Sequence, residues 1–589
     1  MQVEYETRLA ARKRSRNAAE SRHRRLAGFR LLVFALAGGI AWLAFARGAI
    51  SGWWLAVAPL LFAALVYLQS RAAADRRFAE RAIRYYEQGL ARLDHTWMGK
   101  GETGERFRDP THPYAEDLDL FGTGSLFELL STSRTRSGEA QLARWLLHPA
   151  DREEVLLRQG AIEELRTRTD LREDLAVLGE DFRTGVEPEA LAAWGAAGRI
   201  EFSPGTQRAA AALSLLAAAL IVIFFASNFA SAPVRIALLI VAAIEGLLAL
   251  PLRGKIAQVV NSVEQPGHDL DLLAQVLARF ERERFRSPKL AALRRELDVQ
   301  GKPASGRIAQ LERLIDLLHS RDNVIVRAFG PLVLWTTQVA FAIERWRAVS
   351  GAAVGRWLHA IGELEALCAL SGYAYEHPDD PFPELLEGEA FLRGTALGHP
   401  LLPADACVRN DAALSSTGPN LVVISGSNMS GKSTYLRTVG VNAVMALAGA
   451  SVRAREMTIS QLRIGASIRV SDSLQGGTSR FYAEITRLRD IVALAGEGPV
   501  LFLLDELLNG TNSRDRGIGA AGVARGLLQR GAIGFITTHD LALTSIAEIN
   551  RHFEDHIEAG VVTFDYKIRD GVVKNSNALE LMRAIGLEV

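Results

Sequence analysis

A glycine-rich segment near the carboxyl end of the chain has the residues needed to bind phosphate. Gly426-x-x-x-x-Gly431-Lys432-Ser433 follows the apolar run Leu421–Ser425 and precedes the helix-favouring run Thr434–Leu447. In a strand–loop–helix unit of this kind, backbone N–H groups surround phosphate oxygens and the helix N-terminus adds positive potential. We expect Lys432 to neutralise the β- and γ-phosphates and Ser433 to bind Mg²⁺. The segment therefore predicts a P-loop that binds ATP through Gly426, Ser427, Asn428, Met429, Ser430, Gly431, Lys432, Ser433 and Thr434.

An acidic pair follows a second apolar run. Val500–Leu504 has the composition of a buried strand, and Asp505 and Glu506 come directly after it. At the carboxyl edge of a parallel sheet, Asp505 would hold Mg²⁺ through water and Glu506 would polarise the attacking water. The alternative is an ordinary acidic pair at the end of a strand. Its position after a P-loop favours the catalytic interpretation.

A histidine follows a third apolar run. Ala532–Ile536 is succeeded by Thr537-Thr-His-Asp540. His539 could sense the γ-phosphate or orient water, although a lone histidine is more commonly structural. Its place after a core strand favours the functional role.

Length and composition set the context of this site. At 589 residues, 49% of them hydrophobic and 23% charged, the chain predicts roughly three to five structural units without long disorder. The net charge of +1 argues against bulk attraction to nucleic acid. Cys368 and Cys407 have no metal-ligand spacing and fit a reducing compartment.

Two pairs of apolar runs predict helical hairpins that cross a membrane. The first covers 26–70, where Arg30 must extend its charge toward water, and Trp42, Trp53 and Trp54 would lie at the interfaces. The second covers 208–252, with runs at Ala209–Ala226 and Ile236–Leu250. Glu245 interrupts the last run. Glu245 could face a partner helix, or it could indicate that the segment is a buried helix of a soluble domain.

Basic residues predict the orientation of both hairpins. Arginines are dense before the first hairpin, up to Arg25, and after it, from Arg71 to Arg84, whereas the turns hold only Arg47 and Arg235. The positive-inside rule then places every soluble part in the cytoplasm, with the chain a multi-pass protein of the plasma (inner) membrane. The N-terminal basic run could instead grip nucleic acid, but the adjacent apolar segment favours membrane flanking. A secretory signal is disfavoured, because a second apolar run follows the first at once.

The other segments that precede the phosphate-binding region are predicted to be helical. Leucine-rich periodic runs, such as Ile308–Leu318, predict a packed helical body that ends near Asp379-Asp-Pro-Phe-Pro383. In the tail, we expect a β-hairpin that turns at Asp570-Gly571 and a short helix at Ala578–Ile585. The expected segments are a basic N-terminus (1–25), hairpin 1 (26–70), a first helical core part (71–207), hairpin 2 (208–252), a second helical part (253–380) and the ATPase domain (385–589).

Taken in order, the motifs resemble those of the MutS family of mismatch-repair and related ATPases. The matching segments are Ser425-Gly-Ser-Asn-Met-Ser-Gly-Lys-Ser-Thr-Tyr-Leu-Arg437, Gly477-Thr-Ser-Arg-Phe-Tyr-Ala-Glu484, Leu504-Asp-Glu-Leu-Leu-Asn-Gly-Thr-Asn512 and Thr538-His539, with Gly398-His-Pro400 and Asn410-Asp411 at the entry to the domain. Ser427 and Ser430 depart from the family's usual Pro and Gly, and Arg480 departs from its usual Thr. Upstream, Gly124–Gly138, Leu142–Pro149 and Ile361–Leu370 are similar to parts of the family's helical core.

The resemblance implies lever helices before a P-loop domain of the MutS, ABC-ATPase-like type. Together with the membrane hairpins expected from the apolar runs, it gives an α + α/β fold. It also implies a homodimer in which Ser479 reaches the ATP of the second subunit, with Glu484 nearby. We find no segment that resembles the family's mismatch-reading domain, and 251–360 is too short for a full DNA clamp beside the levers.

Three functions follow as hypotheses. The first is a membrane-anchored ATPase that uses Mg²⁺ and couples its nucleotide state to helical levers. The second is an ATP-regulated protein that binds mismatched or branched DNA. The third is a transporter of the ABC type, which four spans and the sequence Gly477-Thr-Ser-Arg480 disfavour.

Overall fold

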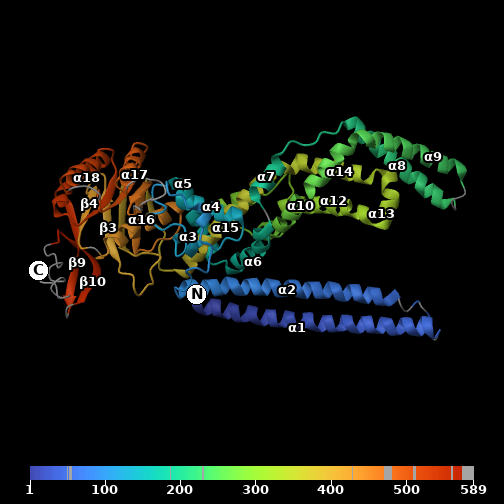
Figure 1. Ribbon diagram of the computed structural model, residues 1–589, viewed down its shortest axis with the longest axis horizontal. Helices are drawn as coiled ribbons and strands as arrows, with labels where there is room; N and C mark the ends of the chain where they lie inside the picture. Colours follow the sequence, from blue (N-terminus) through green and yellow to red (C-terminus); the bar gives the residue numbers. More distant parts are fainter. Residues whose placement is uncertain are drawn as a thin grey trace. The chain divides into compact units, whose positions relative to one another are not determined.

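The chain folds into two compact units. The computed structural model describes residues 1–48, 51, 53, 56–185, 187–227, 231–427, 429–469, 480–508, 513–558 and 561–573. Unit 1 contains Met1–Thr132, Leu142–Val177 and Leu367–Val589, and unit 2 contains Ser133–Gln141 and Leu178–Ala366. Figure 1 shows that unit 1 includes all of the sheet structure (left) and that unit 2 is helical.

The described residues of unit 1 form two sheets. The larger has the strand order β10-β9-β4-β8-β7-β6, in which all neighbours are parallel except β10 and β9. The smaller has the order β1-β5-β2-β3. The strands are β1 (Glu384–Leu386), β2 (Phe391–Leu397), β3 (Asn410–Ser415), β4 (Leu421–Ser425), β5 (Glu456–Ser460), β6 (Arg463–Ser467), β7 (Val500–Asp505), β8 (Ile533–Thr538), β9 (Ile549–Glu558) and β10 (Val561–Asp570).

Both faces of the larger sheet are buried, which explains why its central strands are continuously apolar. Alternate residues such as Val423 and Phe502 share one apolar cluster with Ile491 of α17 (Arg480–Leu494) and with α18 (Ser513–Leu528). On the opposite face, Phe535 packs against Tyr435 of α16 (Lys432–Ala448), with ring centroids 5.6 Å apart. The 3-10 helix η8 (Leu541–Ile546) follows β8.

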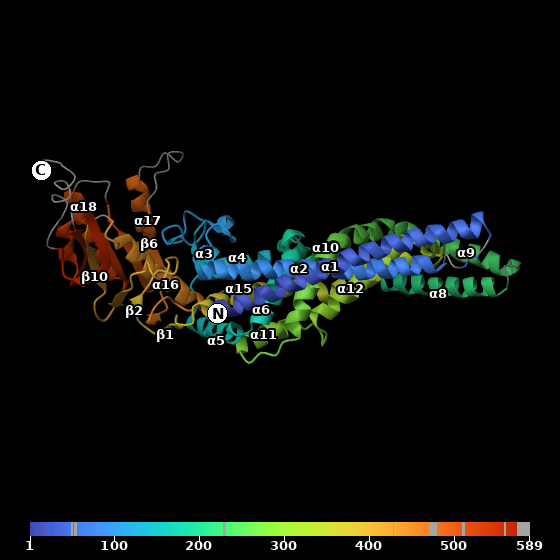
Figure 2. The same ribbon diagram turned by 90° about the horizontal axis from the view of Figure 1, so that it is seen from below.

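A long helical hairpin begins unit 1. Helix α1 (Gln2–Ala41) continues as a π-helical turn, η1 (Trp42–Ala46), and runs beside α2 (Val57–Leu93) (Figures 1 and 2). Gly89 allows the close approach, because a Cβ atom there would lie 2.6 Å from the Tyr5 ring. The base of the hairpin is fixed by a buried ion pair. Arg92 donates two hydrogen bonds to Glu376, of 2.8 and 2.6 Å, and the Tyr5 hydroxyl donates a third at 3.2 Å.

The other helices before the sheets are shorter. Unit 1 contains η3 (Glu105–Phe107), α3 (Leu126–Leu130) and α5 (Arg152–Arg166), while α4 (Arg136–Leu147), α6 (Thr169–Gly185) and α15 (Val354–Glu376) have residues in both units. Ser125 caps α3 by accepting the Glu128 N–H at 3.2 Å, and Asp151 caps α5 by accepting the Glu154 N–H at 2.8 Å.

Unit 2 is built on α10, α12 and α14, which contact one another in pairs. Gly267 permits the approach of α12, because a Cβ atom there would lie 2.1 Å from the end of Ile315. The helices of unit 2 are α7 (Pro188–Ala196), α8 (Pro204–Ala226), α9 (Ala232–Ala249), η4 (Leu250–Leu252), α10 (Arg253–Glu281), α11 (Pro288–Glu296), α12 (Ala304–His319), η5 (Ser320–Asp322), α13 (Val324–Phe329), η6 (Gly330–Val333), α14 (Trp335–Ser350) and η7 (Gly351–Ala353).

Four helices of the described residues are long and apolar enough to cross a membrane. They are Gln2–Ala46, Val57–Leu93, Pro204–Ala226 and Ala232–Glu281, and at most 11% of each apolar window is buried inside the protein. A fifth segment, Val326–Val333 with Trp335–Glu376, qualifies only as a pair bent by 69°. The helices extend beyond the predicted hairpins 26–70 and 208–252: α1 begins at Gln2, and α9 continues through η4 into α10.

One prediction about local structure was wrong. The tail hairpin does not turn at Asp570-Gly571, because β10 pairs with the ten-residue β9 before it, a longer partner than Val572-Val573. The predicted helix Ala578–Ile585, like Trp54, lies outside the described residues. Within the first hairpin, Arg30 donates to Gln69 of α2 at 2.5 Å, and the extension of its charge toward water stays a prediction. The Gln69 amide oxygen thus pairs with one guanidinium nitrogen, while Arg30 Nε has no hydrogen-bond partner among the described residues.

Candidate functional site

The register of three parallel strands brings the predicted site residues to one edge of the larger sheet. β4 ends at Ser425, β7 at Asp505 and β8 at Thr538. Ser425 lies opposite Thr538, and Asp505 lies opposite Thr537. Because parallel strands end at the same edge, the loops that follow them share one region of space. Residues more than 100 positions apart in the sequence, such as Ser425 and Thr538, therefore lie close together in the fold.

The loop after β4 has the backbone of a phosphate cradle. Gly426, Met429 and Gly431 have φ angles of 151°, 75° and 104°. A Cβ atom on Gly431 would lie 3.0 Å from the Tyr566 ring. Glycine is therefore required at 431 for both the backbone conformation and the space. Gly431 caps α16, which begins at Lys432 and directs its N-terminus at the cradle.

Lys432 is held inside this loop. Its Nζ donates to the Gly426 and Ser427 carbonyl oxygens at 2.9 and 2.8 Å and lies 3.7 Å from Glu506 Oε1. Only 4% of the residue is exposed, and this burial lowers the pKa of Lys432, while Glu506 and Asp505 oppose the shift. An incoming phosphate would supply a stronger counter-charge than the two carbonyls.

Asp505 connects two strand ends to the start of α16. Its Oδ2 accepts a hydrogen bond from Ser433 Oγ at 2.5 Å, and its Oδ1 accepts one from the Thr537 hydroxyl. One carboxylate and one hydroxyl are hard oxygen ligands, and Mg²⁺ is commonly bound by so few protein groups together with phosphates. No cluster of three or more His, Cys, Asp or Glu side chains capable of holding a metal ion exists in the described part of the chain. The residues fit a Mg²⁺ that is bound with the nucleotide.

Glu506 and His539 lie together beside Lys432. Glu506 has a φ of 48°, and its N–H donates to Thr537 O at 3.2 Å. This strained backbone directs the carboxylate toward Lys432, and His539 Nδ1 lies 3.6 Å from Glu506 Oε1. The histidine side chain is half-exposed, so it can approach a ligand in the pocket. Nearby, the buried Glu484 accepts the N–H of Leu508 at 2.5 Å.

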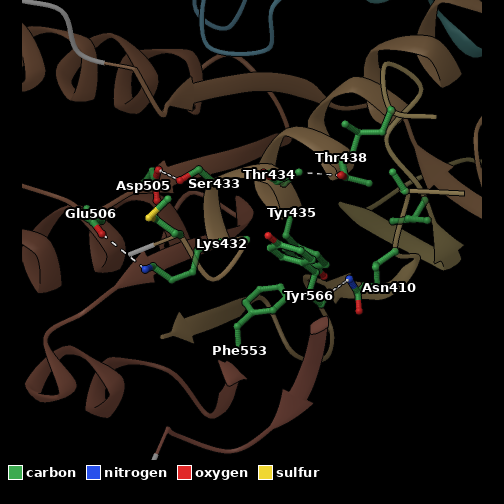
Figure 3. Close-up of a pocket in the computed structure, with 16 residues that line it drawn as sticks. Asn410, Lys432, Ser433, Thr434, Tyr435, Thr438, Asp505, Glu506, Phe553 and Tyr566 are labelled. Atoms are coloured by element: carbon green, nitrogen blue, oxygen red, sulfur yellow. Dashed lines mark hydrogen bonds and ion pairs between the residues drawn. The ribbon is translucent and has the colours of Figure 1, made fainter. Parts of the chain in front are cut away.

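A cavity of about 670 Å³ adjoins these residues. Figure 3 shows Lys432, Ser433, Asp505 and Glu506 at one end and Tyr435, Phe553, Tyr566 and Asn410 at the other. Asn410 Nδ2 donates to Tyr566 O at 2.9 Å and thereby joins β3 to β10. The polar end suits phosphates and the aromatic end suits a base.

Sequence reasoning missed several residues of this pocket. Thr537 could have been found from its place before Thr538-His539, but its bond to Asp505 depends on strand register. Tyr566 and Phe553 carry no local motif, and they reach the cavity only because β9 extends the sheet beside β4. Asn428 and Ser479, both predicted to bind nucleotide, lie outside the described residues.

A loop from the helical part of unit 1 contacts the same α/β domain. Asp117 O accepts from Arg437 Nε of α16 at 3.0 Å, and Asp117 Oδ1 accepts the N–H groups of Ile468 and Arg469 at 2.6 and 2.7 Å. Arg469 also pairs with Asp119 at 2.5 Å. The loop is therefore bonded to the helix that starts at the phosphate cradle and to the segment after β6.

Comparison with known proteins agrees with this geometry. Residues 422–588 match the family model described as MutS domain V. The chain is 34% identical over 286 residues to the DNA mismatch repair protein MutS of Natronomonas pharaonis, a match covering 47% of this chain and 32% of that protein. It is 34% identical over 216 residues to DNA mismatch repair protein MutS 2 of Haloarcula marismortui, covering 35% and 23%, respectively.

A bacterial relative gives the same result. The DNA mismatch repair protein MutS of Thermotoga petrophila is 30% identical over 236 residues, which cover 38% of this chain and 29% of that protein. The matched part thus spans about a third or less of each relative. These matches support membership of the MutS family for the C-terminal α/β region, at low identity and over part of the chain.

Proposed function

We propose that this protein is a membrane-anchored ATPase of MutS type. The observation that carries the proposal is the convergence of Lys432, Ser433 and Asp505 with Glu506 at one sheet edge, beside a cavity of suitable size. ATP would lie with its phosphates in the 426–433 cradle and its base toward Tyr566. Ser433 and Asp505 would hold a Mg²⁺ that enters with the nucleotide, and the ion would supply positive charge to neutralise the phosphates.

Each residue of the site then has a defined role in ATP hydrolysis. Lys432 exchanges its bonds to the Gly426 and Ser427 carbonyls for phosphate oxygens and stabilises charge on the transferred group. Glu506 accepts a proton from the attacking water, and the adjacent His539 orients that water or the γ-phosphate. Thr537 holds the Asp505 carboxylate in place. The buried Ser427 and Ser430 hydroxyls have no partner within the described residues and are further donors for phosphate.

Hydrolysis requires a second copy of the chain in this proposal. The resemblance assigns Ser479 to the ATP of the partner subunit, and Met429 at the cradle is 83% exposed, as a residue at an interface between subunits would be. Closure of two such domains would complete both sites at once, since a two-fold interface presents the same patch twice.

The nucleotide state would reach the helices through the Asp117 loop. This loop follows α2 in the chain and is bonded to α16 and to the segment after β6. A shift of α16 on ATP binding would therefore pull directly on the segment that leads to the first hairpin. Coupling of this kind needs a chain of packed or bonded groups, which these contacts supply.

Exposed apolar side chains support the membrane anchor. In the first hairpin, Leu31, Phe34 and Phe45 are 75%, 76% and 80% exposed, and in the second, Leu215 and Leu239 are 73% and 71% exposed. Such a surface is unfavourable in water and favourable in the hydrocarbon core of a bilayer. The distribution of arginines favours cytoplasmic soluble parts at a plasma membrane.

We predict that Lys432→Ala and Glu506→Gln each lower Mg²⁺-dependent ATP turnover by about 100-fold or more, because each removes stabilisation at the reacting phosphate. Glu506→Gln should still bind ATP, whereas Lys432→Ala should bind it weakly. Steady-state phosphate release and equilibrium binding of a fluorescent ATP analogue measure the two effects. Asp490→Asn, a change at an exposed carboxylate of α17, is the control. Wild-type turnover in both variants would refute the assigned site.

A second prediction concerns the anchor. The chain should remain in the membrane pellet after an alkaline carbonate wash, because four apolar spans cannot be released by removing charge contacts. Fractionation followed by immunoblotting measures this outcome, with a known peripheral protein as the control. Release into the supernatant would eliminate the membrane spans while leaving the ATPase proposal intact.

The names of the relatives favour a second candidate function, ATP-regulated binding to mismatched or branched DNA. This function predicts affinity for such DNA that changes with the bound nucleotide and falls steeply with salt, because phosphate contacts release counterions. Fluorescence anisotropy with matched, mismatched and four-way DNA at two salt concentrations tests it. Equal and weak binding to all three, with no effect of ATP, would exclude this candidate.

A further inference from the structure

Unit 2 contains a second cavity, of about 950 Å³, where the second apolar hairpin meets the rest of the unit. One wall is a single helical face formed by Ala242, Glu245, Gly246, Ala249 and Arg253, which recur at three- and four-residue spacing. The small residues on this face create the space. A Cβ atom added to Gly246 would meet nothing within 4 Å.

Glu245 is the unusual member of this wall. The residue is only 2% exposed, and neither carboxylate oxygen has a hydrogen-bond partner within the described part of the chain. A buried carboxylate without a partner is costly, so its presence calls for a ligand that donates to it. The cavity that it lines has room for such a ligand.

The opposite wall is a bend between α13 and α14. Leu334 has a φ of 48°, and the helices on its two sides differ in direction by 69°. The bend is held against α8, since Ser214 Oγ donates to Val333 O at 2.8 Å and accepts from Gln338 Nε2 at 3.1 Å. Arg321 and Arg327 line the cavity from this side.

The charged side chains of this cavity therefore form two groups, one basic and one acidic. Three arginines, Arg253, Arg321 and Arg327, border the cavity, while Glu245 lies in the apolar helix about 12 Å before Arg253, at about 1.5 Å per residue. Helical side chains lean toward the N-terminus of their helix, so Arg253 extends toward the level of Glu245. A ligand that spans both parts must have an anionic group near the arginines and a cationic donor near Glu245.

We propose that this cavity binds the headgroup of an aminophospholipid, such as phosphatidylethanolamine. The inference rests on the proposed membrane anchor. The phosphate diester accepts hydrogen bonds from the arginines, and the ammonium group donates to the free oxygens of Glu245. The acyl chains lie along exposed apolar residues of the same helical segment, including Leu247 at 70% and Leu250 at 59% exposure.

Other ligands fit less well. A lipid with a net anionic headgroup, such as phosphatidylglycerol, offers Glu245 only neutral hydroxyl donors and no cation to offset the carboxylate charge. A divalent cation would find a single carboxylate, because no cluster of three acidic, His or Cys side chains occurs among the residues that the structure describes. A soluble phosphate ester would not use the exposed apolar residues of that helical segment.

The test is native mass spectrometry of the full chain, purified in detergent and supplied with equal amounts of phosphatidylethanolamine and phosphatidylglycerol. The wild type should retain phosphatidylethanolamine preferentially. Glu245→Gln should lower that preference by about tenfold, the effect of one lost charge-assisted interaction. Gly246→Leu should abolish retention of both lipids by filling the cavity, and Arg327→Gln should weaken both equally.

Two variants of exposed residues in unit 2, Glu264→Gln and Arg356→Gln, serve as matched controls and should retain lipid as the wild type does. ATP turnover of Glu245→Gln in detergent should stay within about twofold of wild type, which shows that the variant is folded. Equal retention of the two lipids by the wild type, or an unchanged preference in Glu245→Gln, would overturn the proposal. If the chain stays in the membrane pellet after the carbonate wash, either of these outcomes refutes the lipid site and leaves the proposed membrane anchor intact.

Discussion

The parallel register of β4, β8 and β7 is the constraint on which the candidate site depends. It places Asp505 beside Thr537 and within reach of Ser433, so that one carboxylate joins two strand ends to the helix that begins at the cradle. Lys432 and Glu506 then face each other across the same edge. A slip of one residue in β7 would turn Asp505 to the other face of the sheet and dismantle the arrangement.

The helical part shows how such a site could act at a distance. α2 extends from the apolar hairpin to Leu93, and the loop that follows it is bonded to α16 through Asp117 and Arg437. In unit 2, the second apolar hairpin continues through η4 into α10 without a flexible connection. Apolar hairpins thus continue as structural helices, which suits a protein that transmits nucleotide-dependent movement to a membrane.

Much of the site was predictable because its motifs are local. The strand at Leu421–Ser425 was predicted with its observed bounds, and the runs at 500–504 and 532–536 lie within a residue or two of β7 and β8. The walls of the pocket were not predictable. Tyr566, Phe553 and the Thr537–Asp505 bond depend on strand order and register, which a single sequence does not encode locally. The tail hairpin failed for the same reason: Asp570-Gly571 is a good turn signal, but the longer β9 offered β10 a better partner.

In the proposed ATPase, each hydrolytic site needs residues from two subunits. Mixing Lys432→Ala chains with Ser479→Ala chains, each inactive alone, tests this claim most directly. Random exchange makes half of the dimers mixed, and each mixed dimer has one intact site of two. We therefore predict that the mixture recovers roughly a quarter of wild-type ATP turnover. Absence of recovery, with mixed dimers shown to be present by differential tagging, would contradict a shared site.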